Sequence, residues 1–121
     1  MTTYNDVILN VLENAFPDEV DFLGQTVIEN AIENVKMENA DSASNLDNSE
    51  ILATIITAIG IIKPIAEVFA LLYDRLKRIP TKAEVNKEIS EQKIATTKNE
   101  ADKYVDLLIN YYLEKNRNAN S

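Results

Sequence analysis

The chain has 121 residues, of which 45% are hydrophobic and 26% are charged. This balance is typical of one globular domain, so we treat residues 1–121 as a single domain and exclude a fully disordered chain. The sequence contains no cysteine and no histidine. This excludes disulfides, the usual zinc sites and catalysis by Ser–His–Asp or Cys–His systems. Two glycines and three prolines allow few tight turns, which favours an all-α fold.

The net charge of −8 is unevenly distributed. Residues 1–50 contain eleven acids and one base, whereas residues 51–121 contain nine acids and eleven bases. So acidic a first half repels nucleic-acid phosphates, and we expect no nucleic-acid binding through it. Solubility alone is the simpler interpretation of this charge, and docking to a basic protein is the alternative.

Residues 4–37 are predicted to form a hairpin of two helices. Apolar residues recur there at steps of three and four, the period of a helix with one buried face. Pro17 ends the first helix at Phe16, because the residue before a proline disfavours helical geometry. The two apolar runs are Tyr4, Val7, Ile8, Val11, Leu12, Ala15 and Phe16, and then Val20, Leu23, Val27, Ile28, Ala31, Ile32 and Val35.

Residues 38–49 have no apolar period and are predicted to be a polar linker loop. A long apolar helix is predicted over residues 50–78, kinked near Pro64, where Gly60 gives the backbone room to adjust. Its polar or small residues trace one narrow stripe, which predicts a helix buried on most of its circumference. The stripe consists of Glu50, Thr54, Thr57, Gly60, Lys63, Glu67, Ala70, Asp74 and Lys77.

Residues 51–73 are also long enough to span a bilayer. Lys63 and Glu67 oppose simple spanning, since each costs about 2.5–3.5 kcal/mol near a helix centre. They stand four residues apart and could pair with each other. The pattern favours a buried helix in a bundle, and a membrane-inserting or pore-lining helix is the alternative. The candidate assembly or membrane residues are Gly60, Lys63, Pro64, Glu67 and Phe69.

A fourth helix is predicted over residues 82–115, opened by a capping box at Thr81 and Glu84. Thr96, Thr97 and Asn99 mark a hinge in it, and residues 116–121 are predicted to be a disordered tail. Together these elements predict a four-helix bundle-like fold. Tyr111 and Tyr112 are candidate interface residues, although packing against the hairpin explains them more simply.

Carboxylates remain the chemically notable side chains. Pairs such as Asp18 with Asp21, or Glu29 with Glu33, could hold a divalent ion or act as acid and base, but they are more often solvated helix faces. We therefore expect no enzyme activity, no cofactor and no metal. The candidate interaction surface consists of Asp18, Glu19, Asp21, Glu29 and Glu33.

Residues 8–35 resemble the start of bacterial effector-associated, death-like adaptor domains. The resemblance lies in the core Leu12, Ala15, Phe16 and Pro17 and covers about a quarter of the chain. It implies recruitment of partners by like-with-like contacts. The later helices depart from that pattern, so no functional residue is carried over.

The leading hypothesis is a non-catalytic, adaptor-like module for protein interaction or self-assembly, cytoplasmic and of microbial or viral origin. The abundance of asparagine, isoleucine and lysine favours such a source. One alternative is an acidic inhibitor or immunity-type protein that binds a basic target. The other is a membrane-inserting or pore-forming effector acting through residues 51–73.

Overall fold

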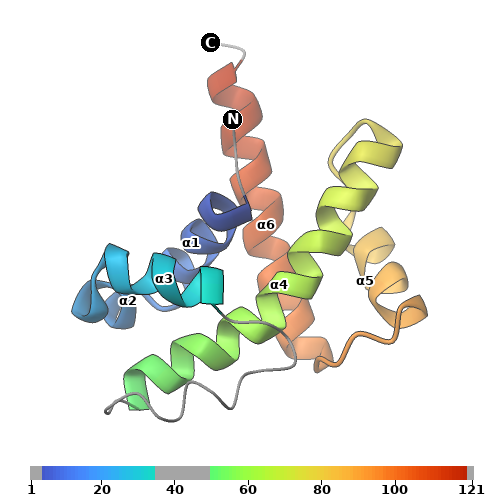
Figure 1. Cartoon of the computed structure of the whole chain (residues 1–121). Coiled ribbons are helices and arrows are strands. Elements are labelled where there is room, and N and C mark those ends of the chain that lie inside the picture. Colours follow the sequence, from blue (N-terminus) through green and yellow to red (C-terminus); the bar gives the residue numbers. More distant parts are fainter. Residues whose placement is uncertain (1–3, 35–49, 120–121) are drawn as a thin grey trace. The chain divides into compact units, whose positions relative to one another are not determined.

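The computed structural model describes residues 4–34 and 50–119, and within these ranges it contains six helices and no strand (Figure 1). The all-α prediction is confirmed, while the four-helix, bundle-like arrangement stays a prediction. The chain forms two compact units, Met1–Lys63 and Pro64–Ser121, referred to below as unit 1 and unit 2. The linker predicted at residues 38–49 lies outside the described residues.

Unit 1 contains three short helices and the first part of a long one. These are α1 (Tyr4–Ala15), α2 (Pro17–Leu23), α3 (Gln25–Asn34) and α4 (Glu50–Leu76), of which α4 continues into unit 2. The apolar run of α1 forms its buried face, with Ile8, Val11 and Leu12 completely inaccessible. Pro17 ends α1 as expected, and it occupies the first turn of α2, where a missing N–H costs nothing.

One continuous helix after Pro17 is a wrong prediction, because the chain breaks at Gly24. This residue has φ +89°, a conformation that side-chain-bearing residues rarely adopt, and its N–H caps α2 by donating to the Val20 carbonyl. The chain becomes helical again at Gln25, where α3 begins, and both α2 and α3 contact α1. Ile28 and Ile32 stay buried as predicted, but Val27 is 40% exposed.

Helix α4 passes through Gly60 and Pro64 without a break. Every member of the polar stripe that lies in it is exposed or half-buried, so the predicted wet edge is confirmed. The opposite face is completely buried at Ile55, Ile59, Ile62, Ile65 and Phe69. The predicted kink near Pro64 stays a prediction.

Unit 2 contains the rest of α4 together with α5 (Lys82–Glu91) and α6 (Lys98–Ala119). The predicted capping box is confirmed: the Thr81 hydroxyl accepts from the Glu84 N–H at 3.1 Å, and the Thr81 N–H donates to the Glu84 carboxylate at 2.8 Å. Helices α5 and α6 contact each other. Their buried faces carry Val85 and Ile89 on α5, and Ala101, Tyr104, Val105 and Leu108 on α6.

A single helix over residues 82–115 is a wrong prediction, but residues 92–97 are not helical, so the break lies next to the hinge predicted at Thr96, Thr97 and Asn99. Lys93 adopts a left-handed conformation with φ +55°, and its N–H donates to the Ser90 carbonyl while the Ile94 N–H donates to the Ile89 carbonyl. This bonding pattern is a Schellman motif, which ends a helix. A second reciprocal cap, between Thr97 and Glu100, starts α6. Helix α6 continues to Ala119, into the stretch predicted as a tail.

Candidate interaction surfaces

The junction of α2 and α3 carries exposed apolar side chains beside acidic ones. Phe22 is 70% exposed, and Asp18, one helical turn before it, shares its face of α2. Asp21 is its exposed neighbour, and Val27 lies three residues beyond Gly24. We call Asp18, Asp21, Phe22 and Val27 the acidic corner. Gly24 separates the helices that carry these side chains, since α2 ends at Leu23 and α3 begins at Gln25.

The predicted acidic surface is distributed over two helices. Asp18, Glu19 and Asp21 lie on α2, with Asp18 and Asp21 exposed and Glu19 half-buried. Glu29 and Glu33 lie one turn apart on α3, where Glu29 accepts a hydrogen bond from the Gln25 amide at 2.9 Å.

Sequence reasoning overlooked Phe22, the central apolar residue of this surface. The signal was present, since Phe22 is an aromatic residue that falls outside the apolar period of its segment. Such a residue must either lie in solvent or meet a second packing partner.

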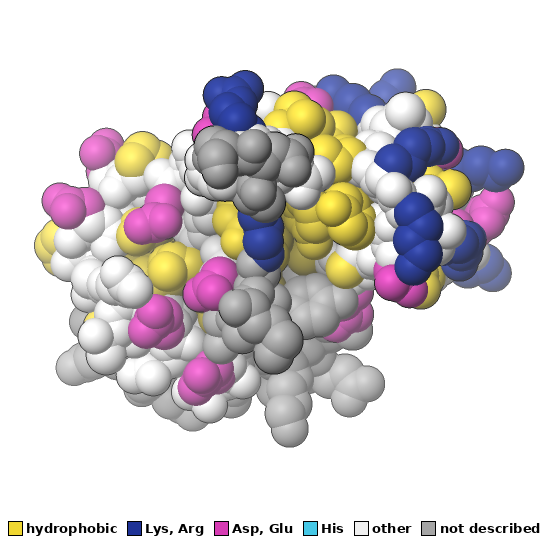
Figure 2. Space-filling view, turned by 90° about the horizontal axis from the view of Figure 1, so that it is seen from above, with side chains coloured by type: hydrophobic (Ala, Val, Ile, Leu, Met, Phe, Trp, Pro, Cys, Tyr) yellow, Lys and Arg dark blue, Asp and Glu magenta, His cyan; other side chains and the backbone are white. Residues whose placement is uncertain are grey.

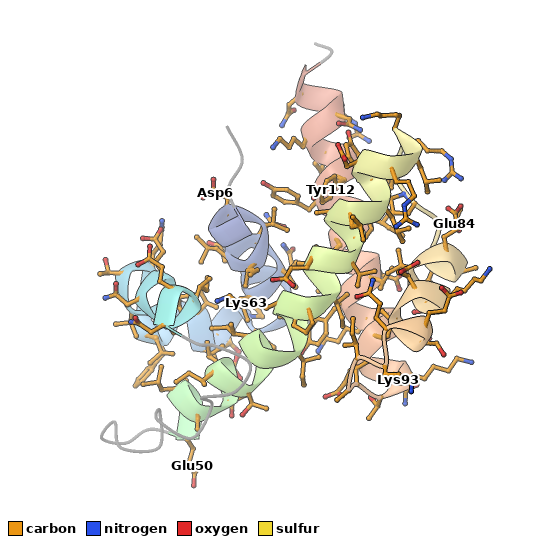
Figure 3. The ribbon with its side chains drawn as sticks, turned by 45° about the vertical axis from the view of Figure 1, so that its right-hand side comes forward. Asp6, Glu50, Lys63, Glu84, Lys93 and Tyr112 are labelled. Carbon is orange, nitrogen blue, oxygen red and sulfur yellow. The ribbon has the colours of Figure 1, made fainter. Side chains whose placement is uncertain are left out.

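Lys63 has a specific partner inside unit 1. Its ammonium group donates to the Ile32 carbonyl oxygen at 2.6 Å, across 31 positions of sequence. Figure 3 shows the Lys63 side chain extending from α4 between the helices of unit 1. The Ile32 carbonyl lies in the last turn of α3, where carbonyls lack helical partners and a cation is favourable. The charge that interrupts the apolar helix thus caps a neighbouring helix.

The other candidate residues of α4 have different surroundings. Pro64 and Phe69 are buried, Gly60 is half-buried and Glu67 is exposed. A side-chain carbon added at Gly60 would meet nothing within 4 Å outside its own helix. By length and composition alone, Glu50–Leu76 could cross a membrane: its most apolar window has a mean hydropathy of 2.0, and 61% of that window is buried.

The C-terminal halves of α4 and α6 pack through aromatic rings. The Tyr112 ring centroid lies 4.7 Å from that of Phe69 and 5.0 Å from that of Tyr73. Tyr111 makes an edge contact with Tyr112 at 5.7 Å. The Tyr73 hydroxyl lies 3.4 Å from the Asn116 side-chain oxygen. Tyr111 and Tyr112 are both half-buried, and Tyr112 fills the centre of this aromatic cluster within unit 2 (Figure 3).

Two leucines are exposed at this same end of unit 2. Leu71 on α4 is 45% exposed and Leu113 on α6 is 49% exposed. Each has an exposed arginine four residues later, Arg75 and Arg117, on the same helix face. Leu71 stands two residues from both Phe69 and Tyr73, so it lies on the side of α4 that faces away from α6, and the two leucines do not share one surface. Figure 2 looks onto the C-terminal ends of α4 and α6, where hydrophobic side chains lie next to Lys and Arg side chains.

An ion pair holds the connection between α4 and α5. Both terminal nitrogens of Arg78 donate to the Glu84 carboxylate at 2.8 Å. These bonds from Arg78 are the main cause that lowers the pKa of Glu84 to about 2, and the hydrogen bond from the Thr81 N–H is the second cause. The same carboxylate raises the pKa of Arg78. In α6, burial raises the pKa of the Tyr104 hydroxyl, and the negative charge of Glu100 adds to this.

An open cleft of about 550 Å³ lies between α5 and α6. Several of its polar groups are already bonded within the protein: the Asn86 amide donates to Asp102 at 3.0 Å, and the Thr97 hydroxyl donates to Glu100 at 3.0 Å. The cleft therefore offers a ligand mainly the exposed side chains of Lys93 and Lys98 above an apolar floor. Its lining consists of Asn86, Ile89, Ser90, Lys93, Ile94, Thr96, Thr97, Lys98 and Ala101.

Within residues 4–34 and 50–119, no three acidic side chains come close enough together to hold a metal ion. Comparisons with protein families, with curated proteins and with solved structures find no match to this chain.

Proposed function

We propose that this chain is a non-catalytic protein-docking module that binds a cationic surface of its partner through the acidic corner. The observation that carries the proposal is Phe22, an aromatic side chain that is 70% exposed on a helix one turn from a carboxylate. Aromatic residues dominate the energetics of protein interfaces, where water is excluded from a central apolar contact. Acidic residues around such a contact select a partner of opposite charge and steer its approach.

Burial of Phe22 in a partner would supply one central contact of an interface. Complete burial of a phenylalanine side chain contributes about 1.5–3 kcal/mol. Phe22 still has most of this burial available, and Val27 adds part of a second side chain at the same corner. In protein interfaces, two or three contacts of this size, together with complementary charges, typically carry most of the binding energy.

Site-specific photocrosslinking tests this function. A photoreactive phenylalanine analogue replaces Phe22 in cells that naturally contain the chain, and the same analogue replaces the exposed Asn110 of α6 as a matched control. We expect a discrete protein adduct from position 22, absent from position 110 and lost when Asp18 and Asp21 are changed to lysine. The absence of any discrete adduct at position 22 would overturn the proposal.

The identity of the adduct separates an adaptor from an inhibitor. For an inhibitor, the crosslinked protein has an activity of its own, which the purified chain suppresses in a salt-sensitive manner. For an adaptor, the chain binds without changing any activity of the partner. Salt sensitivity is expected in both cases, because the corner acts partly through charge.

A membrane-acting function is the second candidate, favoured by the length and hydropathy of Glu50–Leu76. Flotation with vesicles and release of an entrapped dye test it directly. A chain that floats with vesicles and releases dye supports this candidate. A chain that does neither is inconsistent with it and leaves the docking function in place.

A further inference from the structure

We propose that the cleft between α5 and α6 binds a small carboxylate with an apolar chain, such as a medium-chain fatty acid. The cleft has a volume of about 550 Å³, and sites for small ligands typically measure about 300–1,000 Å³. It lies in unit 2, whereas the acidic corner belongs to unit 1, so this site is independent of the proposed docking function.

The end of α5 builds the apolar floor of the cleft. Because Lys93 adopts the left-handed conformation, the chain turns and the Ile94 N–H donates to the Ile89 carbonyl. A Schellman motif commonly brings these two side chains into contact. Ile89 and Ala101 are buried, but Ile94 is only half-buried. The connection that carries Ile94 joins α5 to α6 (Figure 1), and its apolar side chain is left for a ligand to cover.

The charged side chains of the cleft have one sign. Among the described residues, its lining includes Lys93 and Lys98, both exposed, and no acidic residue. Neither ammonium group makes an ion pair or a hydrogen bond with any residue that the structure describes. Lys82 of α5 differs in this respect, because it pairs with Asp106 of α6 at 3.1 Å. The cleft thus keeps two positive charges that the rest of unit 2 leaves unpaired.

The carboxylates beside the cleft along the chain lie outside its lining. Glu88 accepts a hydrogen bond from the Gln92 amide at 2.9 Å, and Glu100 accepts one from the Thr97 hydroxyl at 3.0 Å. Glu91 is exposed at the end of α5 and does not line the cleft either. The two ammonium groups are therefore the charges that a ligand in the cleft meets.

This lining determines the class of ligand. An apolar chain would cover Ile94, and a carboxylate would lie near Lys93 and Lys98. Lysine binds an anion as a point charge, without the planar fork by which arginine holds a phosphate or a carboxylate at two points. A neutral or cationic molecule with the same chain can make the apolar contact only. Preference for the carboxylate over these two analogues is therefore the signature of the site.

An NMR titration of the full chain with octanoate, below its micellar concentration, gives the first measurement. We expect the amide signals of Ser90, Ile94, Thr96 and Ala101 to move and to saturate together. Octanol and octylammonium are the matched ligands, because they keep the chain and change only the charge of the head group. Octanol should bind about fivefold more weakly than octanoate, as the loss of two exposed ion pairs predicts, and octylammonium more weakly still.

A double variant, Lys93→Gly with Lys98→Gln, gives the deciding measurement. It removes both charges and keeps the left-handed turn, so octanoate should bind about fivefold more weakly while octanol binds as before. The control Lys87→Gln with Lys115→Gln removes two exposed charges of α5 and α6 outside the cleft and should bind octanoate like the wild type.

Three results would each overturn the inference. These are equal affinity for octanoate and octanol, signal changes confined to residues outside the cleft, and unchanged octanoate binding by the double variant. Circular dichroism checks that both variants are folded. The docking function is tested separately by the adduct at position 22, so the two failures are distinguishable.

Discussion

Replacing Lys63 with methionine removes the hydrogen bond from Lys63 to the Ile32 carbonyl in unit 1. Methionine keeps the apolar length of the lysine stem, so the change isolates the ammonium group, which donates to the Ile32 carbonyl at 2.6 Å. A hydrogen bond to a charged group contributes about 1.5–3 kcal/mol, and an unpaired carbonyl left behind costs a similar amount. Because Lys63 is only half-buried, water can partly replace the lost donor. We therefore expect a loss of about 1.5–2 kcal/mol of folding free energy.

Urea unfolding followed by circular dichroism measures this loss as a shift in the midpoint at unchanged slope. Lys77→Met is the matched control, because the same change is made one residue past the end of the same helix in a side chain that is 80% exposed. The control should change the folding free energy by less than about 0.5 kcal/mol. Equal stabilities for Lys63→Met and the wild type would refute the reasoning. Faster amide exchange in the last turn of α3 would place the loss at the predicted helix end.

Three further predictions concern caps and backbone. Lys93→Gly should stabilise the protein by about 0.5–1 kcal/mol in thermal unfolding, because glycine adopts the left-handed conformation without strain. A destabilised variant would contradict the left-handed conformation of Lys93. Gly24→Ala should destabilise the protein by about 1–2 kcal/mol, because φ is +89° at Gly24. Gly60→Ala should stabilise it by about 0.5–1 kcal/mol. Changes of the same sign in the free energy of unfolding for both variants would be inconsistent with the structure. The Glu84 carboxyl, held by Arg78, should titrate by NMR near its lowered pKa of about 2. Its contribution to stability is then present above the ordinary pKa of 4.5 and is lost as the pH falls from there toward 2, so a midpoint close to 4.5 would disprove the pairing.

The sequence predicts which faces of the helices are buried, because burial follows the helical period. Val11 and Leu12 in α1, and Tyr104 and Leu108 in α6, are buried as that period requires. The capping box at Thr81 was likewise recognisable from four consecutive residues. These features depend on local spacing, which the sequence displays directly.

The helix ends that were missed depend on weaker signals. Lys93 ends α5 in a conformation usually supplied by glycine, so no glycine marks the position. Thr97 and Glu100 have the same spacing as the first capping box, and that signal was available but unused. The bond from Lys63 to Ile32 spans 31 residues, and no local pattern predicts such a pairing. For the acidic corner, the sequence analysis identified the carboxylates Asp18 and Asp21 but did not identify the aromatic residue Phe22.

The roles of Lys63 and Glu67 also bear on the choice between docking and membrane insertion. Moving α4 into a bilayer would cost little at its isoleucines, because lipid is as apolar as the protein core. The main costs lie elsewhere. Lys63 and Glu67 would each add about 2.5–3.5 kcal/mol near the centre of a bilayer. Lys63 would also lose its bond to the Ile32 carbonyl of α3.

Docking through the acidic corner requires none of these changes. Phe22 and Val27 are already exposed, and Lys63 keeps its bond to the Ile32 carbonyl. Lys63→Met separates the two mechanisms, because it makes α4 more apolar and at the same time releases it from α3. If insertion is the function, this variant should bind vesicles more strongly than the wild type. If docking is the function, it should lose stability without gaining vesicle binding, and its crosslinking from position 22 should persist under conditions where it remains folded.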